Sequence, residues 1–385
     1  MDADARFETL AIHAGYRPDP ATGAVMPPIY ASSTFEQDAP GADRGYEYAR
    51  TNNPTREALE GNLAALEGGR HARAFASGMA AINTVMNLLD TGDRVVAGRD
   101  LYGGTHRLFR QVYADYGLTF DFVEMTDLDA VAAALEEPTD LVWLESPTNP
   151  LLKVVDLEAV ADLAHDREAL VAVDNTFATP YLQRPLDLGA DVVCHSLTKY
   201  LGGHSDVVAG ALVTDDPALD ERFGFYQNAV GATPDPFACY LVWRGTKTLG
   251  MRMDRHCANA HAVATWLADE PAVERVYYPG LEIHPGHALA AEQMADFGGM
   301  VSVELDADLE TTAAVVTDLE VFTLAESLGG VESLVEVPAA MTHAGLDPAE
   351  RRAHGIADGL VRLSIGVEHV DDLLADLDRA VDRAR

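Results

Sequence analysis

The chain has 385 residues, and its 62 acidic and 27 basic residues give a formal net charge of −35. A surface of that sign repels nucleic-acid phosphates and anionic lipids, so neither nucleic acid nor a membrane is an expected partner. Hydrophobic residues make up 48% of the chain, which is enough for a folded core and excludes bulk disorder. The length predicts two domains, and we expect no membrane span and no signal peptide.

Lysine is scarce in this chain. The 27 basic residues include only three lysines, Lys153, Lys199 and Lys247. An acidic surface that is poor in lysine suits a halophilic protein in a high-salt cytoplasm. Genomic base bias toward arginine codons explains the same count, and both explanations stay open. The three cysteines show no paired spacing, which favours a reducing, cytoplasmic location.

Composition divides the chain into three segments. Residues 1–50 are rich in proline and tyrosine, lack a clear periodicity and are expected to form an N-terminal arm. A helix is predicted to begin after Asn53, because asparagine caps helices and Pro54 suits the first helical position. Residues 51–245 are expected to form a large domain, and residues 246–385 a smaller α+β domain.

Short apolar runs alternate with amphipathic stretches through the first half of the chain, which predicts an α/β fold with a mostly parallel sheet between helices. The predicted strands are Arg94–Ala97, Thr119–Val123, Leu141–Leu144, Leu170–Val173, Asp191–Cys194 and Val207–Val213. Beyond them we predict a long helix over Ala238–Arg255, strands over Met300–Leu305 and Leu360–Ile365, and a helix over Val370–Arg383.

Several common chemistries lack their sequence signatures. No Gly-x-Gly-x-x-Gly follows an early strand, and neither a Gly-Lys-Ser/Thr loop nor a His-Glu-x-x-His motif is present. His284 and His287 flank a Pro-Gly turn that suits metal ligands poorly. Both are expected to be structural, and no metal site is predicted.

Lys199 follows a predicted buried strand, in the segment HSLTKYLGGH. Open α/β sheets place ligands at the carboxyl ends of their strands. A lysine there can form an imine with an aldehyde while Ser196 and Thr198 hold a phosphate, which is typical of a pyridoxal phosphate (PLP) site. Arginine cannot replace it, because its guanidinium stays charged. The structural alternative is a solvated lysine at the end of a strand.

Three other segments supply further parts of such a site. Gly78 and Met79 open a predicted helix, whose first N–H groups would meet a phosphate. Asp174 ends a predicted strand and is placed to pair with a protonated pyridine nitrogen. Tyr102 lies in another loop that follows a strand, where its ring could stack on the cofactor.

The chain resembles the Cys/Met-metabolism family of fold type I PLP enzymes, and within it the cystathionine γ-synthases and γ-lyases. The resemblance covers nearly the whole chain and rests on IHAGYRPDPATGAVMPPIYASSTF (12–35), YEYARTNNPTR (46–56), SGMAA (77–81), LYGGTHR (101–107), ESPTNP (145–150), VDNTF (173–177), HSLTKYLGGHSD (195–206), FTLAESLGGVESL (322–334) and VRLSIGVE (361–368). It implies a large, mostly parallel mixed sheet flanked by helices and a smaller C-terminal α+β domain.

The resemblance also implies roles for individual residues. Lys199 is expected to bind the cofactor aldehyde, Asp174 its ring nitrogen and Tyr102 its ring face, and these three residues are the expected catalytic groups. The phosphate is expected to contact Gly78, Met79, Ser196 and Thr198, together with Tyr48 and Arg50 from a neighbouring subunit. The implied assembly is a homotetramer, built as a dimer of dimers with shared sites.

The expected substrates are small amino acids. The resemblance implies that Arg362 binds the substrate α-carboxylate with help from Asn149 and Ser327. It places Glu47, Glu326 and Arg107 at the distal end of the pocket.

The preferred reaction is γ-replacement of the cystathionine γ-synthase type, in which an activated homoserine ester and cysteine give cystathionine. Cystathionine γ-lyase is the alternative, and a catalytically silent binding protein with the same fold is a further one. Gly104 stands where methionine γ-lyases carry a cysteine, which disfavours that activity.

Overall fold

The strands in the first half of the chain form one mixed sheet. The structure is a computed structural model that describes residues 5–342, 344 and 347–382. Within them, the larger sheet has the spatial order β1 (His71–Phe75), β7 (Gly210–Thr214), β6 (Val192–Ser196), β5 (Leu170–Asp174), β4 (Leu141–Glu145), β2 (Arg94–Gly98) and β3 (Thr119–Val123). Neighbours from β6 to β3 are parallel, whereas β7 is antiparallel to β6 and β1. The predicted α/β class with a mostly parallel sheet is confirmed.

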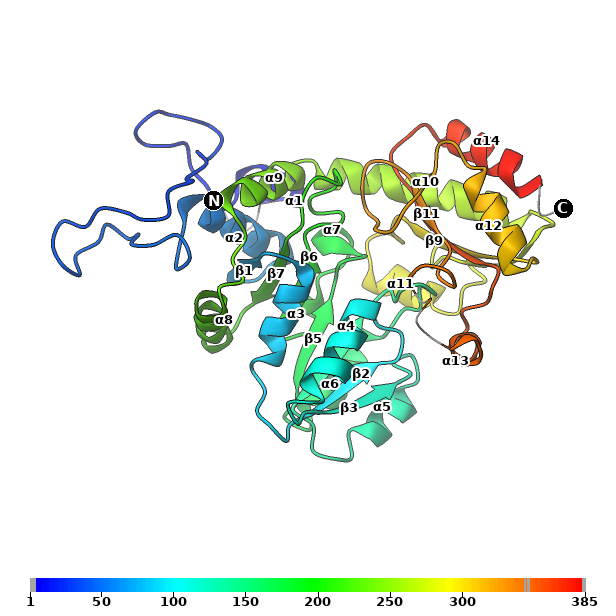
Figure 1. Ribbon diagram of the computed structural model, residues 1–385, viewed down its shortest axis with the longest axis horizontal. Helices are drawn as coiled ribbons and strands as arrows, with labels where there is room; N and C mark the ends of the chain where they lie inside the picture. The colour runs from blue at the N-terminus through cyan, green and yellow to red at the C-terminus, as the bar shows by residue number, and fades with distance from the viewer. Residues whose placement is uncertain (1–4, 343, 345–346, 383–385) are drawn as a thin grey trace.

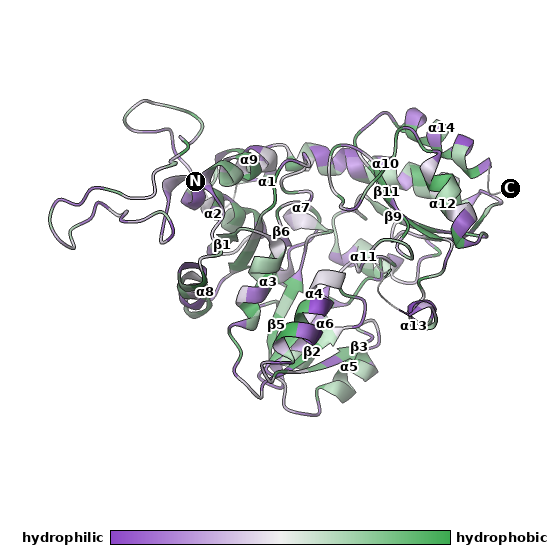
Figure 2. Cartoon of the chain, in the orientation of Figure 1, coloured by the Kyte–Doolittle hydropathy of each residue, from purple (hydrophilic) through white to green (hydrophobic). Residues whose placement is uncertain are grey.

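Helices cover both faces of this sheet (Figure 1). Val85 and Phe223 contribute to the buried cluster on one face, and Val131 and Val160 to the cluster on the other. The central strands are apolar along their length, as the green of β5 in Figure 2 shows, because both of their faces are buried. The helices of this half are α2 (Pro54–Glu67), α3 (Gly78–Met86), α4 (Gly103–Leu108), α5 (Leu128–Ala134), α6 (Leu157–His165), α7 (Thr179–Leu182), α8 (Pro217–Val230) and α9 (Pro236–Thr246).

A second sheet belongs to the C-terminal part of the chain. Its order is β10 (Thr323–Leu324), β11 (Leu334–Glu336), β12 (Leu360–Ser364), β9 (Met300–Leu305) and β8 (Val273–Tyr277). The helices of this part are α10 (Leu249–Ala268), α11 (His287–Gln293), α12 (Leu309–Thr317), α13 (Pro348–Ala353) and α14 (Val370–Val381). The long helix α10 joins the two parts, since Met253 packs in the core beside the first sheet and Val263 in the core of the second.

The N-terminal arm extends away from both sheets beyond its helix α1 (Phe7–His13), which packs against α2 and α10 (Figure 1). Among the described residues of the arm, α1 is the helix, and it was not predicted because the arm sequence shows no clear periodicity. Beyond this helix the backbone is irregular, and two isolated bridges pair Thr34 with Tyr48 and Ala39 with Ala42. Asn53 caps α2 as predicted, because its side chain accepts the N–H groups of Thr55 and Arg56. Among the described residues, no helix is long and apolar enough to cross a membrane.

Candidate active site

Eleven of the fifteen predicted site residues line one cavity of about 320 Å³ at the carboxyl ends of β4, β5 and β6. They come from segments far apart in the sequence: Gly78, Met79, Tyr102, Asn149, Asp174, Ser196, Thr198, Lys199, Glu326, Ser327 and Arg362. The cavity lies where open α/β sheets bind their ligands. The other four, Glu47, Tyr48, Arg50 and Arg107, are exposed and do not line it.

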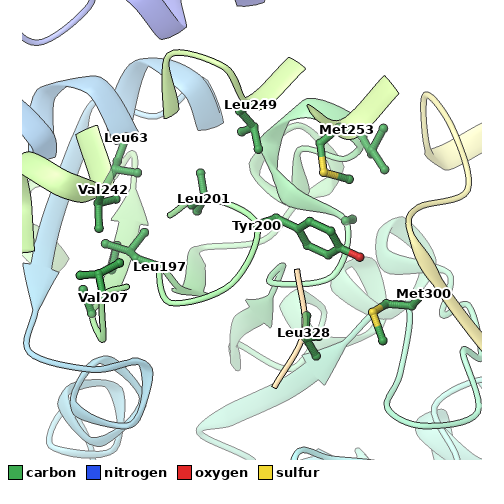
Figure 3. Close-up of a cluster of buried hydrophobic side chains, with 14 of the residues drawn as sticks. Leu63, Leu197, Tyr200, Leu201, Val207, Val242, Leu249, Met253, Met300 and Leu328 are labelled. Atoms are coloured by element: carbon green, nitrogen blue, oxygen red, sulfur yellow. The ribbon is translucent and has the colours of Figure 1, made fainter. Parts of the chain in front are cut away.

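The segment that carries Lys199 is held from behind by apolar packing. Leu197, Tyr200 and Leu201 are buried and point into one hydrophobic cluster with α2, α9 and α10 (Figure 3). Thr198 also fixes the segment, since its hydroxyl accepts the N–H of Ala209 at 3.1 Å. Because the apolar residues on both sides of it pack into this cluster, the Lys199 side chain is left to face the cavity.

The Lys199 amine is set up to lose its proton near neutral pH. Its Nζ donates a hydrogen bond to Ser327 Oγ at 2.6 Å. Burial, and then the positive charge of Arg362, lower the pKa of Lys199 to about 8. Because only the neutral amine is a nucleophile or base, this shift makes Lys199 more reactive than an ordinary lysine.

Arg362 in β12 is held as a rigid fork at the cavity wall. Its Nη1 donates to Asn149 Oδ1 at 2.9 Å, and its Nη2 donates to the carbonyl of Ser327 at 2.9 Å. Nη2 also lies 2.9 Å from Glu336 Oε2, in a register pair between β11 and β12. Its Nε is buried without a hydrogen-bond partner among the described residues. That donor is available to a carboxylate in the cavity.

Two carboxyl groups lie side by side at the ends of β4 and β5, where Glu145 pairs in register with Asp174. Asp174 Oδ1 accepts the N–H of Thr176 at 3.0 Å and also its hydroxyl. Burial raises the pKa of Asp174, and the bonds from Thr176 and the charge of His195 oppose that rise. Burial and the neighbouring Asp174 raise the pKa of Glu145 well above its usual range. The arrangement favours ionisation of Asp174 over Glu145.

An anion-binding cradle lies at the start of α3. Ser77 caps this helix, and its hydroxyl accepts the N–H of Ala80 at 3.1 Å. The N–H groups of Gly78 and Met79 have no carbonyl one turn earlier to bond, so they remain donors. A Cβ atom on Gly78 would lie 3.1 Å from the Cβ of Ser196, and would therefore narrow the cradle between them.

Tyr102 is fixed through its backbone, although the residue as a whole remains 46% exposed. Its N–H donates to both oxygens of Glu145, at 2.9 and 3.0 Å. A Cβ atom on Gly104 would lie 2.4 Å from the Tyr102 ring and 2.8 Å from Met79 Sδ. Glycine at 104 therefore allows the ring to lie where it does.

The sequence motifs missed two contributors. Thr176 orients Asp174 and its Oγ1 accepts the N–H of Ser196 at 2.9 Å, so it joins the ends of β5 and β6. Glu145 anchors the Tyr102 backbone. Both residues stand inside the quoted stretches VDNTF and ESPTNP, so their position after strands was the available signal.

These residues fit PLP on the chemistry of the donors alone. The cradle at Gly78 supplies N–H and hydroxyl donors for a phosphate. Asp174 supplies a carboxylate with Oδ2 free of hydrogen bonds among the described residues, for a protonated ring nitrogen. Lys199 supplies a primary amine with a lowered pKa for an aldehyde.

The comparisons with known proteins identify the family of this chain. A family model described as Cys/Met metabolism PLP-dependent enzyme matches residues 8–382. Cystathionine gamma-synthase of Mycobacterium tuberculosis (strain H37Rv) is 58% identical over 97% of this chain and 96% of that protein. Cystathionine beta-lyase of Coxiella burnetii is 53% identical over 97% of both chains.

Solved structures show the same fold. Cystathionine gamma synthase from Xanthomonas oryzae, solved in complex with aminoacrylate and cysteine, has a TM-score of 0.96 and 47% identity. That comparison covers 99% of this chain and 98% of the other. The expected fold and the PLP dependence are thereby confirmed, and the chain belongs to the Cys/Met-metabolism family of PLP-dependent enzymes.

Proposed function

We propose that this enzyme catalyses γ-replacement, joining an activated homoserine ester to L-cysteine to form L-cystathionine. The observation that carries the proposal is the meeting of Lys199, Ser327 and the Arg362 fork in one cavity. The 58% identity to a cystathionine gamma-synthase supports the choice among family activities. Family membership favours an enzyme over a silent binding protein.

Arg362 is the proposed anchor for the substrate. Its guanidinium is fixed by Asn149 and Ser327, and its free Nε can donate to the α-carboxylate. Anchoring there places the α-carbon near Lys199, because Ser327 contacts both side chains. A preorganised donor pair of this kind also excludes substrates that lack a carboxylate.

PLP, when bound, supplies an aldehyde that joins amino groups and a ring that withdraws electrons from the attached carbon. Lys199 Nζ is the proposed base that takes protons first from Cα and then from Cβ, which γ-chemistry requires. Ser327 Oγ accepts a hydrogen bond from this amine and would orient it, and Asp174 would hold the ring nitrogen protonated. Glu326 lines the cavity and is proposed to face the distal part of the substrate.

The reaction can be tested by following products from two kinds of substrate. Cysteine is supplied with O-acetyl- or O-succinylhomoserine, and cystathionine is supplied separately. We expect cystathionine to accumulate with an ester faster than cystathionine is consumed. Faster release of 2-oxobutanoate from cystathionine would favour the γ-lyase instead, and pyruvate would indicate β-elimination. Lys199→Ala is the control and should abolish turnover in every arm.

We also infer that the arm, residues 1–50, completes the site of a second copy in a dimer that pairs into a tetramer. Tyr48 and Arg50 lie outside the cavity, where Arg50 Nη1 donates to Asn228 Oδ1 at 2.8 Å. The cations that line the cavity, Lys199 and Arg362, are engaged with Ser327 and Glu336. A bound phosphate dianion therefore meets no unengaged cation among the described residues that line the cavity, and an arginine from a second copy suits it.

Subunit mixing tests this sharing. Arg50→Ala and Lys199→Ala should each be inactive or weakened, and a mixed dimer should recover activity because one of its sites carries neither change. Light scattering reports the assembly, and native mass spectrometry reports whether mixed dimers form. Mixed dimers without recovered activity would place Arg50 in its own subunit's site.

A further inference from the structure

A cluster of buried polar side chains lies behind the cavity. Glu67 ends α2 and is 1% exposed, as is His195 in β6. Glu67 Oε1 contacts His195 Nε2 and accepts Asn175 Nδ2 at 3.1 Å. Gln183 Nε2 extends the cluster, donating to Asn175 Oδ1 at 3.0 Å and to the carbonyl of Ser146 at 3.1 Å.

Each strand end that carries a cavity residue also carries a member of this cluster. In the sequence, Ser146 follows Glu145, Asn175 follows Asp174, and His195 precedes Ser196. Side chains alternate between the two faces along a strand, so His195 points away from the cavity into which Ser196 projects. The cluster therefore holds the ends of β4, β5 and β6 from the back of the sheet.

Burial makes the charge of Glu67 expensive unless a cation compensates it. Among the described residues, His195 is the basic side chain whose ring nitrogen contacts Glu67. A carboxylate oxygen only accepts hydrogen bonds, so the contacting Nε2 carries a proton. His195 Nδ1 and Glu67 Oε2 have no hydrogen-bond partner within the described residues. Neither group contacts the cavity, so the mechanism proposed above does not use them.

His195, the basic member of this pair, lies close to Asp174 in the sheet. Asp174 pairs in register with Cys194, and Asn175 N–H donates to the Cys194 carbonyl at 3.0 Å, so His195 is the next residue along β6. Two other titratable groups lie beside Asp174: the Cys194 thiol on β6, whose pKa is raised by burial and then by the charge of Asp174, and Glu145 on β4. A negative charge on Glu145 would act in the opposite direction to a cation. A cation at His195 offsets that effect.

We propose that Glu67 and His195 form a charged pair that positions the ends of β5 and β6 and keeps Asp174 ionised, as a partner for the cofactor's ring nitrogen. His195 is thus a positioning residue that acts through Asp174. The proposal rests on the PLP dependence of the family, and it holds whether the enzyme is a synthase or a lyase. Failure of the proposed γ-replacement would leave it intact.

The test uses the holoenzyme loaded with PLP that carries ¹⁵N in its ring. His195→Gln retains an N–H donor toward Glu67 without the charge, and Glu67→Gln removes the opposite charge. The matched control is His165→Gln, because His165 forms a surface pair with Asp191 at 3.0 Å, away from the cavity. Ring-nitrogen shifts, kcat, KM and melting temperature are measured for each variant with whichever substrate turns over.

We expect both single variants to move the ring-nitrogen signal toward the unprotonated form and to lower kcat about ten-fold or more, with KM within about two-fold. The double variant should regain part of the melting temperature lost by the single variants, because no uncompensated charge remains, but its ring signal should stay shifted. His165→Gln should change none of these. A wild-type ring signal and kcat in His195→Gln would overturn the proposal.

A second measurement covers variants that fail to fold. Side-chain ¹⁵N spectra of histidine-labelled wild-type holoenzyme, assigned with the variant that folds or by through-bond correlation, report the protonation of His195 directly. The proposal expects both ring nitrogens of His195 to be protonated at pH 7.5. A neutral imidazole at that pH would overturn it.

Discussion

Replacing Arg362 with leucine removes the proposed substrate anchor and breaks a buried ion pair in one step. Arg362 is 3% exposed and Glu336 is 1% exposed, and 2.9 Å separates their charged atoms. Removing one partner of such a pair costs about 3–5 kcal/mol of stability, because the other charge stays buried alone. Losing the contact to a substrate carboxylate costs about 2–5 kcal/mol, which lowers kcat/KM about 30-fold to 4,000-fold.

Two companion variants separate these effects. Glu336→Gln leaves the Arg362 side chain in place but removes the negative partner of its buried charge. It should therefore lower stability, while kcat/KM stays within about ten-fold of wild type. Arg362→Lys keeps a charge but loses the two-pronged geometry, so it should lower kcat/KM while keeping more stability than Arg362→Leu. Urea unfolding measures stability, and initial rates give kcat/KM. A folded Arg362→Leu enzyme within about three-fold of wild-type kcat/KM would refute the anchoring role.

Three further predictions concern the cofactor end of the site and the surface. Asp174→Asn should lower kcat at least ~10²-fold in initial-rate assays, because it removes one preorganised charge, and unchanged kcat would assign the ring nitrogen to another residue. In cofactor-free protein, trace acetylation of Lys199 should reach half of its maximum rate near pH 8 and level off at higher pH, since its pKa is about 8. Lys153 is the comparison: burial lowers its pKa, but its hydrogen bonds to Asp100 and Glu124 raise the pKa by more, so its labelling should level off only at higher pH. Mass spectrometry distinguishes the two lysines, and identical pH profiles would contradict the assignment of Lys199. At a net charge of −35, screening over roughly 3 Å in 1 M salt should raise the melting temperature above its value in dilute buffer, and a flat or falling value would favour base bias as the reason for the scarce lysines.

The central strands were predictable because burial on both faces leaves continuous apolar runs. Five of the six predicted strands in the first half lie within about two residues of observed ones, whereas the run at Val207–Val213 begins three residues early. The edge strand β1 was missed, since its sequence HARAF carries charged residues. Arg73 in that strand is accommodated by a two-pronged bond to Asp220 of α8, which no local pattern shows.

In the second half of the chain, the sequence did not reveal where one helix ends and the next begins. The predicted helix over Ala238–Arg255 is two helices, α9 and α10, separated near Lys247. Neither proline nor a left-handed glycine marks this break. Lys247 instead lies 3.8 Å from the Trp243 ring centre and donates to the carbonyl of Ile12, so tertiary contacts fix the turn.

The cavity itself was largely predictable, because motif residues after parallel strands converge at one sheet edge. The pair of Glu67 and His195 was not. Glu67 is the last residue of helix α2, His195 lies on the face of the sheet opposite the cavity, and 128 positions separate them in sequence. Only the fold reveals that they meet.

The tight fit at Gly104 limits how this enzyme could be redesigned. Any side chain at 104 would overlap the Tyr102 ring and would also press on Met79. A cysteine at 104 therefore requires the Tyr102 ring or the Met79 side chain to move, and we expect the single exchange to lower activity. A route toward a side chain at 104 is expected to include a compensating change at position 79.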